Sequence, residues 1–494
     1  MSEQPVKRIE KQIVIDVNPY RTRAVLLENG RAAEVYSELQ DRASLVGNIF
    51  RGRVQSILPG MAAAFIDIGE EKNAFFSMSD LVRRQPQDEG TGEQKTPPPL
   101  KVGQELMVQI VKDPYGTKGA RVSTQISLSG HLLVLFPMDD MIGISKNITD
   151  EDERERLRST VLNGRSEPVG VIIRTAAEGR SEEDILAELN ALIEKWHEVR
   201  TAYRGASAPK RIHREDGLVE RTVRDLFRPD VSRITINDAD SVEAVRAIAE
   251  EVEPGSRERV VLYPNEPNLF EVLGIEKQID EALARRVWLK SGAYIVIDPT
   301  EALVSIDVNS GKNIGKTDLQ QTALATNCEA AKEIARQLRL RDIGGIIIID
   351  FIDLESKDDR AAVVKTLREE MKNDRTTAVV HGMTSLGLVE VTRKKLRDNL
   401  PNSMQIECPC CVRGKMLSPE TVALRIRARV LSAALKEGPR RVSITASPAV
   451  IALIKKHIGE ECRRNGLNES DYELRENASE RTEDFEIRIL RGQK

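Results

Sequence analysis

The chain has 494 residues, of which 40% are hydrophobic, and its 74 basic and 78 acidic side chains give a formal net charge of −4. This length predicts several domains of roughly 100 to 200 residues with buried cores, and it excludes a wholly disordered or collagen-like protein. No stretch approaches the ~20 apolar residues of a membrane helix, so we expect a soluble, cytoplasmic protein without a membrane partner.

Predicted strands dominate the first 130 residues. Residues 12–36 are typical of two strands joined at Asn29-Gly30, a dipeptide that favours a tight hairpin turn. Five short β-rich runs follow and predict a small barrel, at residues 46–57, 62–68, 74–78, 105–111 and 121–128. The polar stretch 83–99, which ends in three prolines, predicts a mobile loop between barrel strands.

Helices and strands alternate from residue 132 onward, which predicts α/β layers. The alternation is clearest between residues 281 and 399, with helices predicted at 281–289, 318–340 and 358–372 and strands at 293–297, 303–308, 345–351 and 377–381. A cysteine-rich link at 406–415 then precedes a tail of about 75 residues, which is within the usual domain range.

Acidic side chains stand at the ends of two predicted strands. Period-two alternation places Asp307 and Asn309 on the polar face of the first strand. The second contains four consecutive isoleucines, which predict burial on both faces of a parallel sheet, and it ends in Asp350. One long helix links the strands, as a right-handed crossover requires, so both acids should emerge at the same carboxyl edge.

A divalent cation would compensate the repulsion between these two carboxylates. Magnesium typically takes one or two carboxylates with water and phosphate oxygens, and a metal-activated water can hydrolyse a phosphodiester. A single Asp after a strand is more often a helix cap or loop acid, but the pair with Asn309 favours the metal site. Asp353 is interpreted as a loop acid, since strand period points it away from Asp350.

The predicted barrel concentrates aromatic and basic side chains, although only 4% of all residues are aromatic. Proteins that bind single strands combine aromatics that stack on bases with cations that follow phosphates. A Phe in a strand is most often core, but the adjacent Phe75 and Phe76 cannot both face inward. The candidates are Phe65, Phe75 and Phe76 with Arg51, Arg53, Lys118 and Arg121.

Several runs, in one order along nearly the whole chain, carry a more specific signal. They are GNIFRGRV at 47–54, AFIDIG at 64–69, KGA at 118–120, IDVNS at 306–310, RQLRLRD at 336–342, IDFID at 349–353 and CPCC at 408–411. The first three resemble an S1-type RNA-binding domain, and the whole set resembles the ribonuclease E/G family. The ribonuclease G branch fits better, because no long disordered extension follows the tail.

The resemblance implies a multidomain α/β and α+β fold, in which an S1-type OB barrel is inserted in an RNase H-like domain. The implied parts are residues 1–42 and 218–280 for the RNase H-like domain, 43–129 for the S1-type domain, 130–217 for a 5′-phosphate sensor, 281–404 for a DNase I-like catalytic domain, 405–418 for a zinc link and 419–494 for a small C-terminal α/β domain.

The resemblance also implies a bacterial endoribonuclease that cuts single-stranded, A/U-rich RNA with Mg²⁺. Its substrates would be ribosomal RNA precursors and mRNA, in rRNA maturation and mRNA decay. Asp307 and Asp350 would be the metal ligands, and Asn309 would orient the attacked phosphate. The residues implied to grip RNA on the barrel are Phe65, Phe75 and Lys118.

A pocket that favours 5′-monophosphorylated RNA ends is implied at Arg174 and Thr175. A guanidinium fork and a hydroxyl can share the oxygens of one phosphate, although an Arg-Thr pair at a strand end is usually only solvated. A further arginine of the family falls near Ser145, where this chain offers Lys146, which lacks the bidentate fork.

Cysteines are few and clustered, which predicts a metal site rather than a disulfide framework. Cys408 and Cys411 have C-x-x-C spacing, but structural zinc needs four ligands. The other two ligands could come from a second chain, and the resemblance implies such a shared Zn²⁺ in a homodimer or homotetramer. Cys410 could replace a ligand or stay free, and a reduced cluster without metal is the alternative.

Two functions are therefore weighed. The leading one is a magnesium-dependent endoribonuclease, and the alternative is a non-catalytic RNA-binding scaffold protein, which would not need paired strand-end acids. A basic cluster near the cysteine link could contact RNA phosphates or could simply be a solvated surface. Its members are Arg393, Lys394, Lys395, Arg397, Arg413, Arg425, Arg427 and Arg429.

Overall fold

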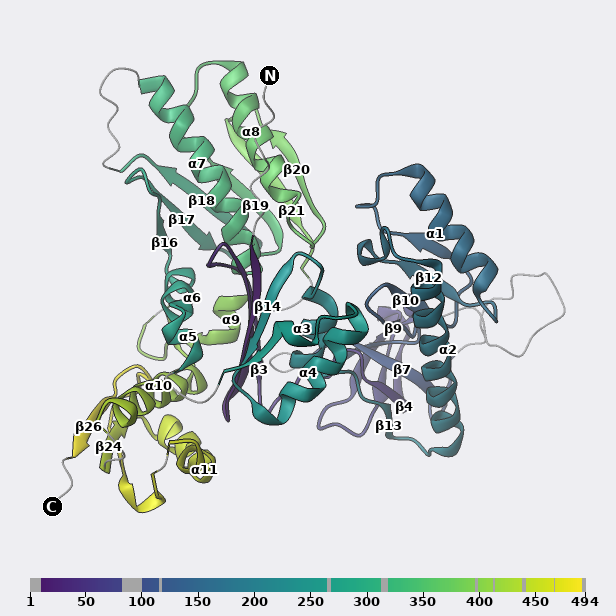
Figure 1. Ribbon diagram of the computed structural model, residues 1–494, viewed down its shortest axis with the longest axis horizontal. Helices are drawn as coiled ribbons and strands as arrows, with labels where there is room; N and C mark the ends of the chain where they lie inside the picture. The colour runs from purple at the N-terminus through teal and green to yellow at the C-terminus, as the bar shows by residue number, and fades with distance from the viewer. Residues whose placement is uncertain are drawn as a thin grey trace. The chain divides into compact units, whose positions relative to one another are not determined.

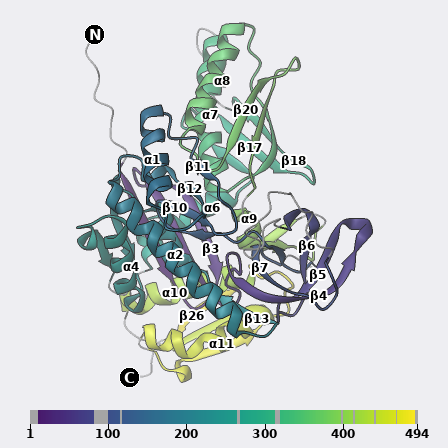
Figure 2. The same cartoon turned by 90° about the vertical axis from the view of Figure 1, so that its right-hand side faces the viewer.

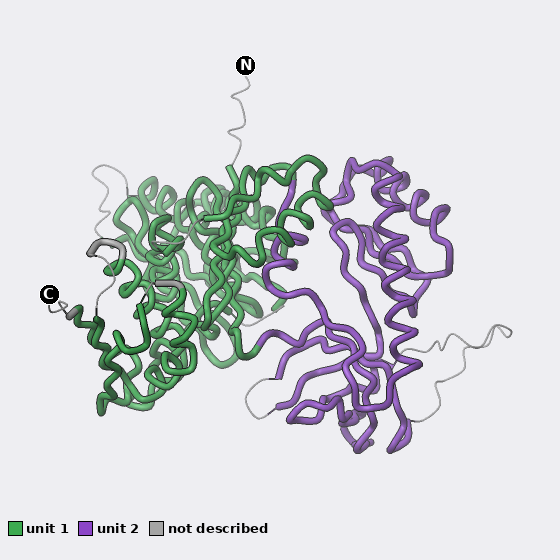
Figure 3. The backbone as a smooth tube through the Cα atoms, turned by 60° about the horizontal axis from the view of Figure 1, so that its bottom comes forward, with its two compact units in different colours: residues 1–42, 229–494 green, residues 43–228 purple. Residues whose placement is uncertain are grey.

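The computed structural model describes residues 10–81, 100–114, 118–263, 268–311, 319–395, 399–411, 414–437, 441–465 and 467–490. The chain divides into two compact units, residues 1–42 with 229–494 and residues 43–228 (Figure 3). The predicted loop at 83–99 lies outside the described residues. Within the described ranges, no helix is long and apolar enough to cross a membrane.

The first sheet of the discontinuous unit joins the N-terminus to residues more than 200 positions later. Its strand order is β15-β14-β1-β2-β3, with β1 parallel to β14 and antiparallel to β2. Residues 12–36 hold parts of three strands, so the prediction of two strands is wrong, but Asn29 and Gly30 do form a turn, between β2 and β3, and both have positive φ, 52° and 74°. The elements are β1 (Lys11–Val17), β2 (Arg21–Glu28), β3 (Arg31–Leu39), β14 (Val231–Ile236), α4 (Ala239–Val252), β15 (Val260–Leu262), α5 (Leu269–Val272) and α6 (Ile275–Leu283).

The continuous unit contains the predicted five-stranded barrel (Figure 2). Pairing between β4 and β7 closes it, as in an OB-type fold, and Phe50 and Phe76 fill its core. The strand β13, which follows the long helix α2, adds to the outside of β4. The elements are β4 (Ile49–Leu58), β5 (Ala63–Asp67), β6 (Ala74–Ser77), β7 (Glu105–Lys112), β8 (Arg121–Ser123) and β13 (Lys210–His213).

A second sheet of this unit, in the order β11-β12-β10-β9, packs against two helices. Asp150 and Ser181 cap these helices, because their side chains accept hydrogen bonds from backbone N–H groups in the first turn. The elements are β9 (Leu128–Ser129), β10 (Leu133–Phe136), β11 (Ile142–Ile144), α1 (Glu151–Gly164), β12 (Gly170–Ile173), α2 (Glu182–Gly205) and α3 (Leu218–Leu226).

The sheet that carries the predicted acids has the order β16-β17-β18-β19-β21-β20, and α7 and α8 cover one of its faces (Figure 1). β18 and β19 are parallel, whereas the flanking pairs β17–β18 and β19–β21 are antiparallel. The elements are β16 (Arg286–Trp288), β17 (Tyr294–Pro299), β18 (Leu303–Asn309), α7 (Leu319–Leu340), β19 (Gly345–Asp350), α8 (Lys357–Met371), β20 (Ala378–Met383) and β21 (Leu388–Arg393).

Two predictions for this sheet are wrong. The helix predicted at 281–289 is instead the end of α6 followed by the edge strand β16. The isoleucine strand β19 is not buried on both faces, because Ile347 and Ile349 face the helices whereas Ile346 is 51% exposed. The other face of the sheet, which also bears Ser305, is called the open face below.

The C-terminal part follows a short hairpin that holds the cysteines. Its three-stranded sheet, in the order β25-β24-β26, packs on α10 and α11. The alternating pattern predicts β24, α11 and β26 but misses β25. The elements are α9 (Leu400–Met404), β22 (Gln405–Glu407), β23 (Lys415–Leu417), α10 (Pro419–Glu437), β24 (Arg441–Ala446), α11 (Pro448–Asn465), β25 (Tyr472–Glu476) and β26 (Glu486–Leu490).

Candidate active site and RNA-binding residues

The structure brings the two strand-end acids together. Asp307 on β18 is the register partner of Asp350 on β19, so the two side chains project from the same face of neighbouring strands. Strands in a sheet lie ~4.8 Å apart, and both carboxylates are exposed on the open face. This spacing allows one cation to contact both carboxylates.

Asn309 lies two residues beyond Asp307 on the same face. Its side-chain Nδ2 donates a hydrogen bond of 2.7 Å to Oδ2 of Asp307. Burial raises the pKa of Asp350, and the charges of Asp307 and Asp353 raise it further. Asp353 therefore contributes to the negative field of the site, although the sequence pattern predicted only a loop acid that points away from Asp350.

A buried polar side chain that sequence reasoning missed holds the segment after β19. Asn327 on α7 is fully buried, at 0% exposure. Its Nδ2 donates to the backbone carbonyl of Ile352 at 2.7 Å, and its Oδ1 accepts from the Ile352 N–H at 3.0 Å. This two-bond clamp fixes the backbone between Asp350 and Asp353. The only signal in the sequence is a polar residue among the alanines and leucines of the helix.

The donor set of this site fits a hard cation such as magnesium. Two carboxylates and a nearby amide leave room for water and phosphate oxygens, which magnesium retains as ligands. Burial is the largest cause of the raised pKa of Asp350, and the charges of Asp307 and Asp353 add a negative field that a cation would relieve. Within the described ranges, no group of three or more His, Cys, Asp or Glu side chains is arranged to hold a metal, and this site has only two carboxylates in register.

Two of the three candidate phenylalanines lie at the surface of the barrel. Phe65 on β5 and Phe75 on β6 are register partners, and their half-exposed rings meet edge to face with centroids 6.2 Å apart. Phe76 points the other way and is fully buried in the barrel core. The prediction that Phe75 and Phe76 face opposite sides is confirmed. Phe65 and Phe75 together form a surface on which bases can stack.

The four cations predicted around these rings differ in their surroundings. Lys118 is exposed. Arg121 pairs with Asp80 at 3.0 Å, and Arg51 pairs with Glu105 and donates to the carbonyls of Tyr203 and Ala206. Arg53 also binds Glu105. The three arginines are therefore held by contacts within the protein, whereas Lys118 is the most available of the four cations for a phosphate.

The predicted phosphate-sensor residues lie at the end of β12. The guanidinium of Arg174 donates to the Gly130 carbonyl at 2.6 Å and to Asp225 at 2.8 Å. The hydroxyl oxygens of Thr175 and Ser145 are 2.8 Å apart. Arg174 is thus held in one orientation by two acceptors, and its side chain is about 30% exposed.

A buried network orders the turn that precedes β10. Glu188 on α2 accepts hydrogen bonds from the backbone N–H groups of His131, Leu132 and Leu133. Burial raises the pKa of Glu188. Burial also lowers the pKa of His131 to about 4, and its Nδ1 donates to the Arg224 carbonyl at 2.6 Å. These contacts position the Gly130 carbonyl that Arg174 binds.

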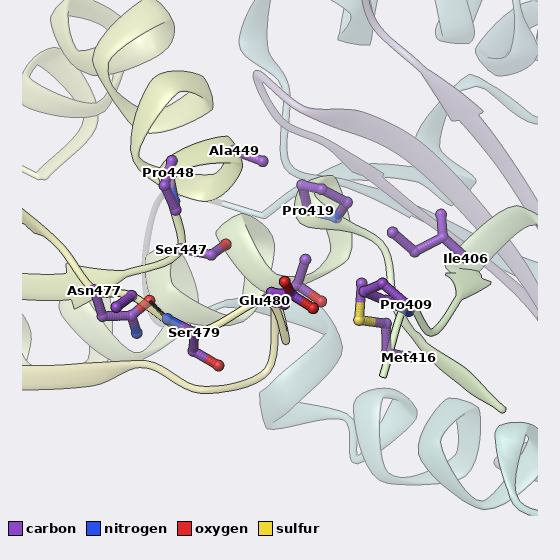
Figure 4. A pocket seen from close by; sticks show the side chains of 12 residues that line it. Ile406, Pro409, Met416, Pro419, Ser447, Pro448, Ala449, Asn477, Ser479 and Glu480 are labelled. Atoms are coloured by element: carbon purple, nitrogen blue, oxygen red, sulfur yellow. Dashed lines mark hydrogen bonds between the residues drawn. The ribbon is translucent and has the colours of Figure 1, made fainter. Parts of the chain in front are cut away.

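The cysteines occupy the tight turn between β22 and β23. The backbone N–H of Cys408 donates to the Gly414 carbonyl, and a hydrogen bond with the Cys411 thiol is the largest cause that lowers the pKa of Cys408. Cys410 instead donates to Glu480 at 3.7 Å. A pocket of about 570 Å³, lined by Pro409 and Glu480 among others, lies beside this turn (Figure 4). The C-x-x-C pair is thus compact, and the third thiol contacts both Cys408 and Glu480.

Most described members of the predicted basic cluster are already neutralised or covered. Arg393 is buried between Asp342 and Asp374, each at 2.7 Å. Three further arginines are engaged and two lysines are exposed, and two members lie outside the described residues. Arg425 pairs with Asp280, Arg427 pairs with Glu461, and Arg429 lies over the ring of Phe485. The exposed lysines are Lys394 and Lys395, and the members outside the described residues are Arg397 and Arg413.

A model of the ribonuclease E/G family matches residues 127–396. The chain is 38% identical to ribonuclease G of Escherichia coli (strain K12) over 451 residues, which cover 90% of this chain and 92% of that protein. It is also 38% identical to ribonuclease G of Haemophilus influenzae, over 89% of this chain and 91% of that protein. Ribonuclease E of Nostoc is 36% identical over 78% of this chain and 58% of its own length. The chain therefore belongs to the ribonuclease E/G family.

Proposed function

We propose that this endoribonuclease hydrolyses single-stranded, A/U-rich RNA at the Asp307–Asp350 pair with the help of magnesium. The observation that carries the proposal is the register pairing of the two carboxylates on the open face of the sheet. A non-catalytic RNA-binding scaffold would gain nothing from the repulsion between these acids. The proposed biological roles, maturation of ribosomal RNA precursors and decay of mRNA, rest on the family resemblance.

Asp307 and Asp350 would hold the magnesium ion. When bound, magnesium lowers the pKa of a coordinated water and neutralises charge that develops on the phosphate. Asn309 restrains Asp307 through the 2.7 Å hydrogen bond, and the second N–H of its amide can donate to a phosphate oxygen. Asn327 keeps the backbone after Asp350 in place. These contacts hold the acids in place before RNA binds.

RNA binding is assigned to the barrel side chains Phe65, Phe75 and Lys118. The two exposed ring faces can stack on unpaired bases, and the lysine can follow a phosphate. Because stacking needs bases that are free of a duplex, this surface supports a preference for single strands.

A 5′-monophosphate is proposed to bind at Arg174 and Thr175. Asp225 and the Gly130 carbonyl already orient the guanidinium, so little side-chain entropy is lost when a phosphate binds. The hydroxyls of Thr175 and Ser145 are hydrogen-bonded to each other at 2.8 Å, so one of them donates within the pair and the other can donate to a phosphate oxygen. This arrangement supports a preference for monophosphorylated ends.

The remaining proposals concern domains and assembly. The order β3-β2-β1-β14-β15 supports an RNase H-like domain, and the sheet of β16 to β21 with its helices supports a DNase I-like catalytic domain. Cys408 and Cys411 supply two of the four ligands of a structural zinc. A second copy of the chain would supply the other two, which makes the protein a homodimer or a homotetramer.

Cleavage of a short A/U-rich RNA tests the substrate and the metal together. The RNA carries either a 5′-monophosphate or a 5′-hydroxyl, and magnesium is present or removed with a chelator. We expect internal cuts that need magnesium, and faster cutting of the monophosphate. Arg174→Ala should reduce the preference for the monophosphate by about 10-fold or more, because hydrogen bonds to charged groups contribute ~1.5–3 kcal/mol. Tight RNA binding without any cut would favour the scaffold function.

A further inference from the structure

An aromatic and cationic cluster lies at the edge of the sheet that carries Asp307 and Asp350. Trp288 on β16 is 60% exposed, and its ring lies against that of Tyr294 on β17, with centroids 5.2 Å apart at 59°. The guanidinium of Arg286 lies over both rings, 4.5 Å from the Tyr294 centroid and 5.7 Å from that of Trp288. We call Arg286, Trp288 and Tyr294 the edge platform.

The register of the sheet places the edge platform on the open face, in line with the active-site residues. Trp288 pairs with Tyr294, and Tyr294 pairs with Asn309. Register partners point to the same face, so these three side chains form one row across three strands. At ~4.8 Å per strand, Trp288 lies ~10 Å from Asn309 along that row.

A second row gives the same relationship for the cation. Arg286 pairs with Val296, which pairs with Asp307, which in turn pairs with Asp350. The guanidinium and the two carboxylates therefore stand on one face of the sheet, separated by a single strand that bears a valine. An RNA strand that places a phosphate at the carboxylates would extend a neighbouring nucleotide over the platform.

The composition of the platform is unusual for a solvent-facing sheet edge. A tryptophan is usually highly buried, because its ring removes a large apolar area from water. No carboxylate among the described residues forms an ion pair with Arg286, whereas the neighbouring Arg285 pairs with Asp298. An exposed indole with a cation stacked over the rings is the combination that binds bases of single-stranded nucleic acids.

We propose that the edge platform stacks one base of the RNA next to the cleaved phosphate. This inference rests on the proposed function and adds a binding position to it. Arg286 and Tyr294 hold the indole in place, and the exposed ring face of Trp288 accepts the base. Stacking reads no base identity, since every base has a flat face, so the platform selects an unpaired nucleotide and not a sequence.

Tryptophan fluorescence tests the contact directly, because the chain has two tryptophans and Trp196 is only 5% exposed. The protein is the full chain with Asp307→Asn, so that a short A/U-rich RNA binds without being cut. We expect saturable quenching that follows binding measured by anisotropy. The quenching should disappear in Asp307→Asn/Trp288→Phe while anisotropy still reports binding. RNA that saturates the protein without changing its emission would overturn the proposal.

Kinetics supply the second test and use RNAs in which one nucleotide at a time is abasic. Trp288→Ala should lower kcat/KM by about 5-fold to 150-fold, since one stacked base is worth ~1–3 kcal/mol. Trp288→Phe should retain most of the activity. When the abasic nucleotide is at one position beside the cut, the kcat/KM of the wild type should fall by the same factor as with Trp288→Ala. On that RNA, Trp288→Ala should cause no further fall in kcat/KM. If the effects of Trp288→Ala and of the abasic nucleotide on kcat/KM multiply at every position, the proposal is overturned.

The control is Val272→Ala, which trims another exposed apolar side chain, on α5, a helix that packs against α6 and β1. It should cleave as the wild type does. If the wild type cuts RNA and Asp307→Asn does not, but Trp288→Ala matches the wild type or changes only the oligomeric state, the platform is wrong and the proposed function stands. If Asp307→Asn cuts normally, both are wrong.

Discussion

Asp307 and Asp350 are register partners on two parallel strands that end at the same edge of the sheet. The pair has an electrostatic cost, because the charge of Asp307 adds to the burial that raises the pKa of Asp350. Packing alone does not require acids there, since the open face is exposed to solvent at both positions. A cation that joins the two carboxylates, as we propose, would offset this cost.

The first prediction concerns stability without and with magnesium. Asp307→Asn removes the repulsion but keeps an oxygen that can accept from Asn309, so the metal-free protein should become more stable at pH 7. The gain should be at most about 1 kcal/mol, because exposed carboxylates interact weakly. Thermal unfolding should also show that magnesium stabilises the wild type and not this variant.

The control for this measurement is Glu301→Gln, which removes an exposed acid at the opposite end of β18. It should leave both the metal-free stability and the effect of magnesium unchanged. An equal response of Glu301→Gln and Asp307→Asn would mean that magnesium screens surface charge in general and that no site exists at the pair.

The second prediction concerns Asn327. Asn327→Ala leaves the N–H and carbonyl of Ile352 unpaired, and each buried unpaired group costs ~1–3 kcal/mol. Urea unfolding should show a loss of about 2–5 kcal/mol, and kcat should fall because the backbone after Asp350 loosens. Asn373→Ala, which changes an exposed side chain after α8, should alter stability by less than ~0.5 kcal/mol. Equal effects of the two changes would contradict the clamp.

The third prediction is a pH dependence that arises at His131. Burial lowers its pKa to about 4, from an ordinary value of 6.5. Between these values the unfolded chain binds the proton and the folded chain does not, so stability falls as the pH falls through this window. The loss can reach about 3 kcal/mol. His131→Gln should be less stable at pH 7 but should flatten this part of the profile, measured by urea unfolding. An unchanged slope would assign the acid sensitivity to other groups.

The fourth prediction separates the cysteines. Cys408→Ser and Cys411→Ser should each abolish zinc binding and shift the protein to a smaller species in analytical ultracentrifugation, because two chains share one ion in the proposed assembly. Cys410→Ser should keep the zinc, since Cys410 lies outside the C-x-x-C pair and its thiol also donates to Glu480. Cys462→Ser, on α11, serves as the control. Zinc that survives in Cys408→Ser, or a protein without zinc in which the assembly is unchanged, would refute the shared site.

Parts of this structure could be predicted because local patterns determine them. The barrel strands, β18 and α7 follow from alternation or helical periodicity, and the isoleucine run correctly marks β19. The same run did not reveal that one face is open, because apolar residues also occur on exposed strand faces. β21 was missed although the alternation of its sequence, LVEVTR, is typical of a strand.

Other parts depend on contacts between residues far apart in the chain. β16 is a three-residue strand that continues the helical pattern of α6, and only its pairing with β17 makes it a strand. The edge platform was therefore invisible in the sequence. Arg393 looked like a free cation because Asp342, one of the acids that neutralise it, is 51 residues away.

Cleavage by Asp307→Asn and Asp350→Asn, beside the wild type and Glu301→Gln, tests the central claim most directly. The measurement is the single-turnover rate on a monophosphorylated A/U-rich RNA in saturating magnesium, with RNA binding followed in parallel. Both aspartate variants should bind the RNA and cut it at least about 100-fold more slowly, the loss typical when a group that stabilises transition-state charge is removed. Undiminished cutting by either variant would contradict the two-carboxylate site.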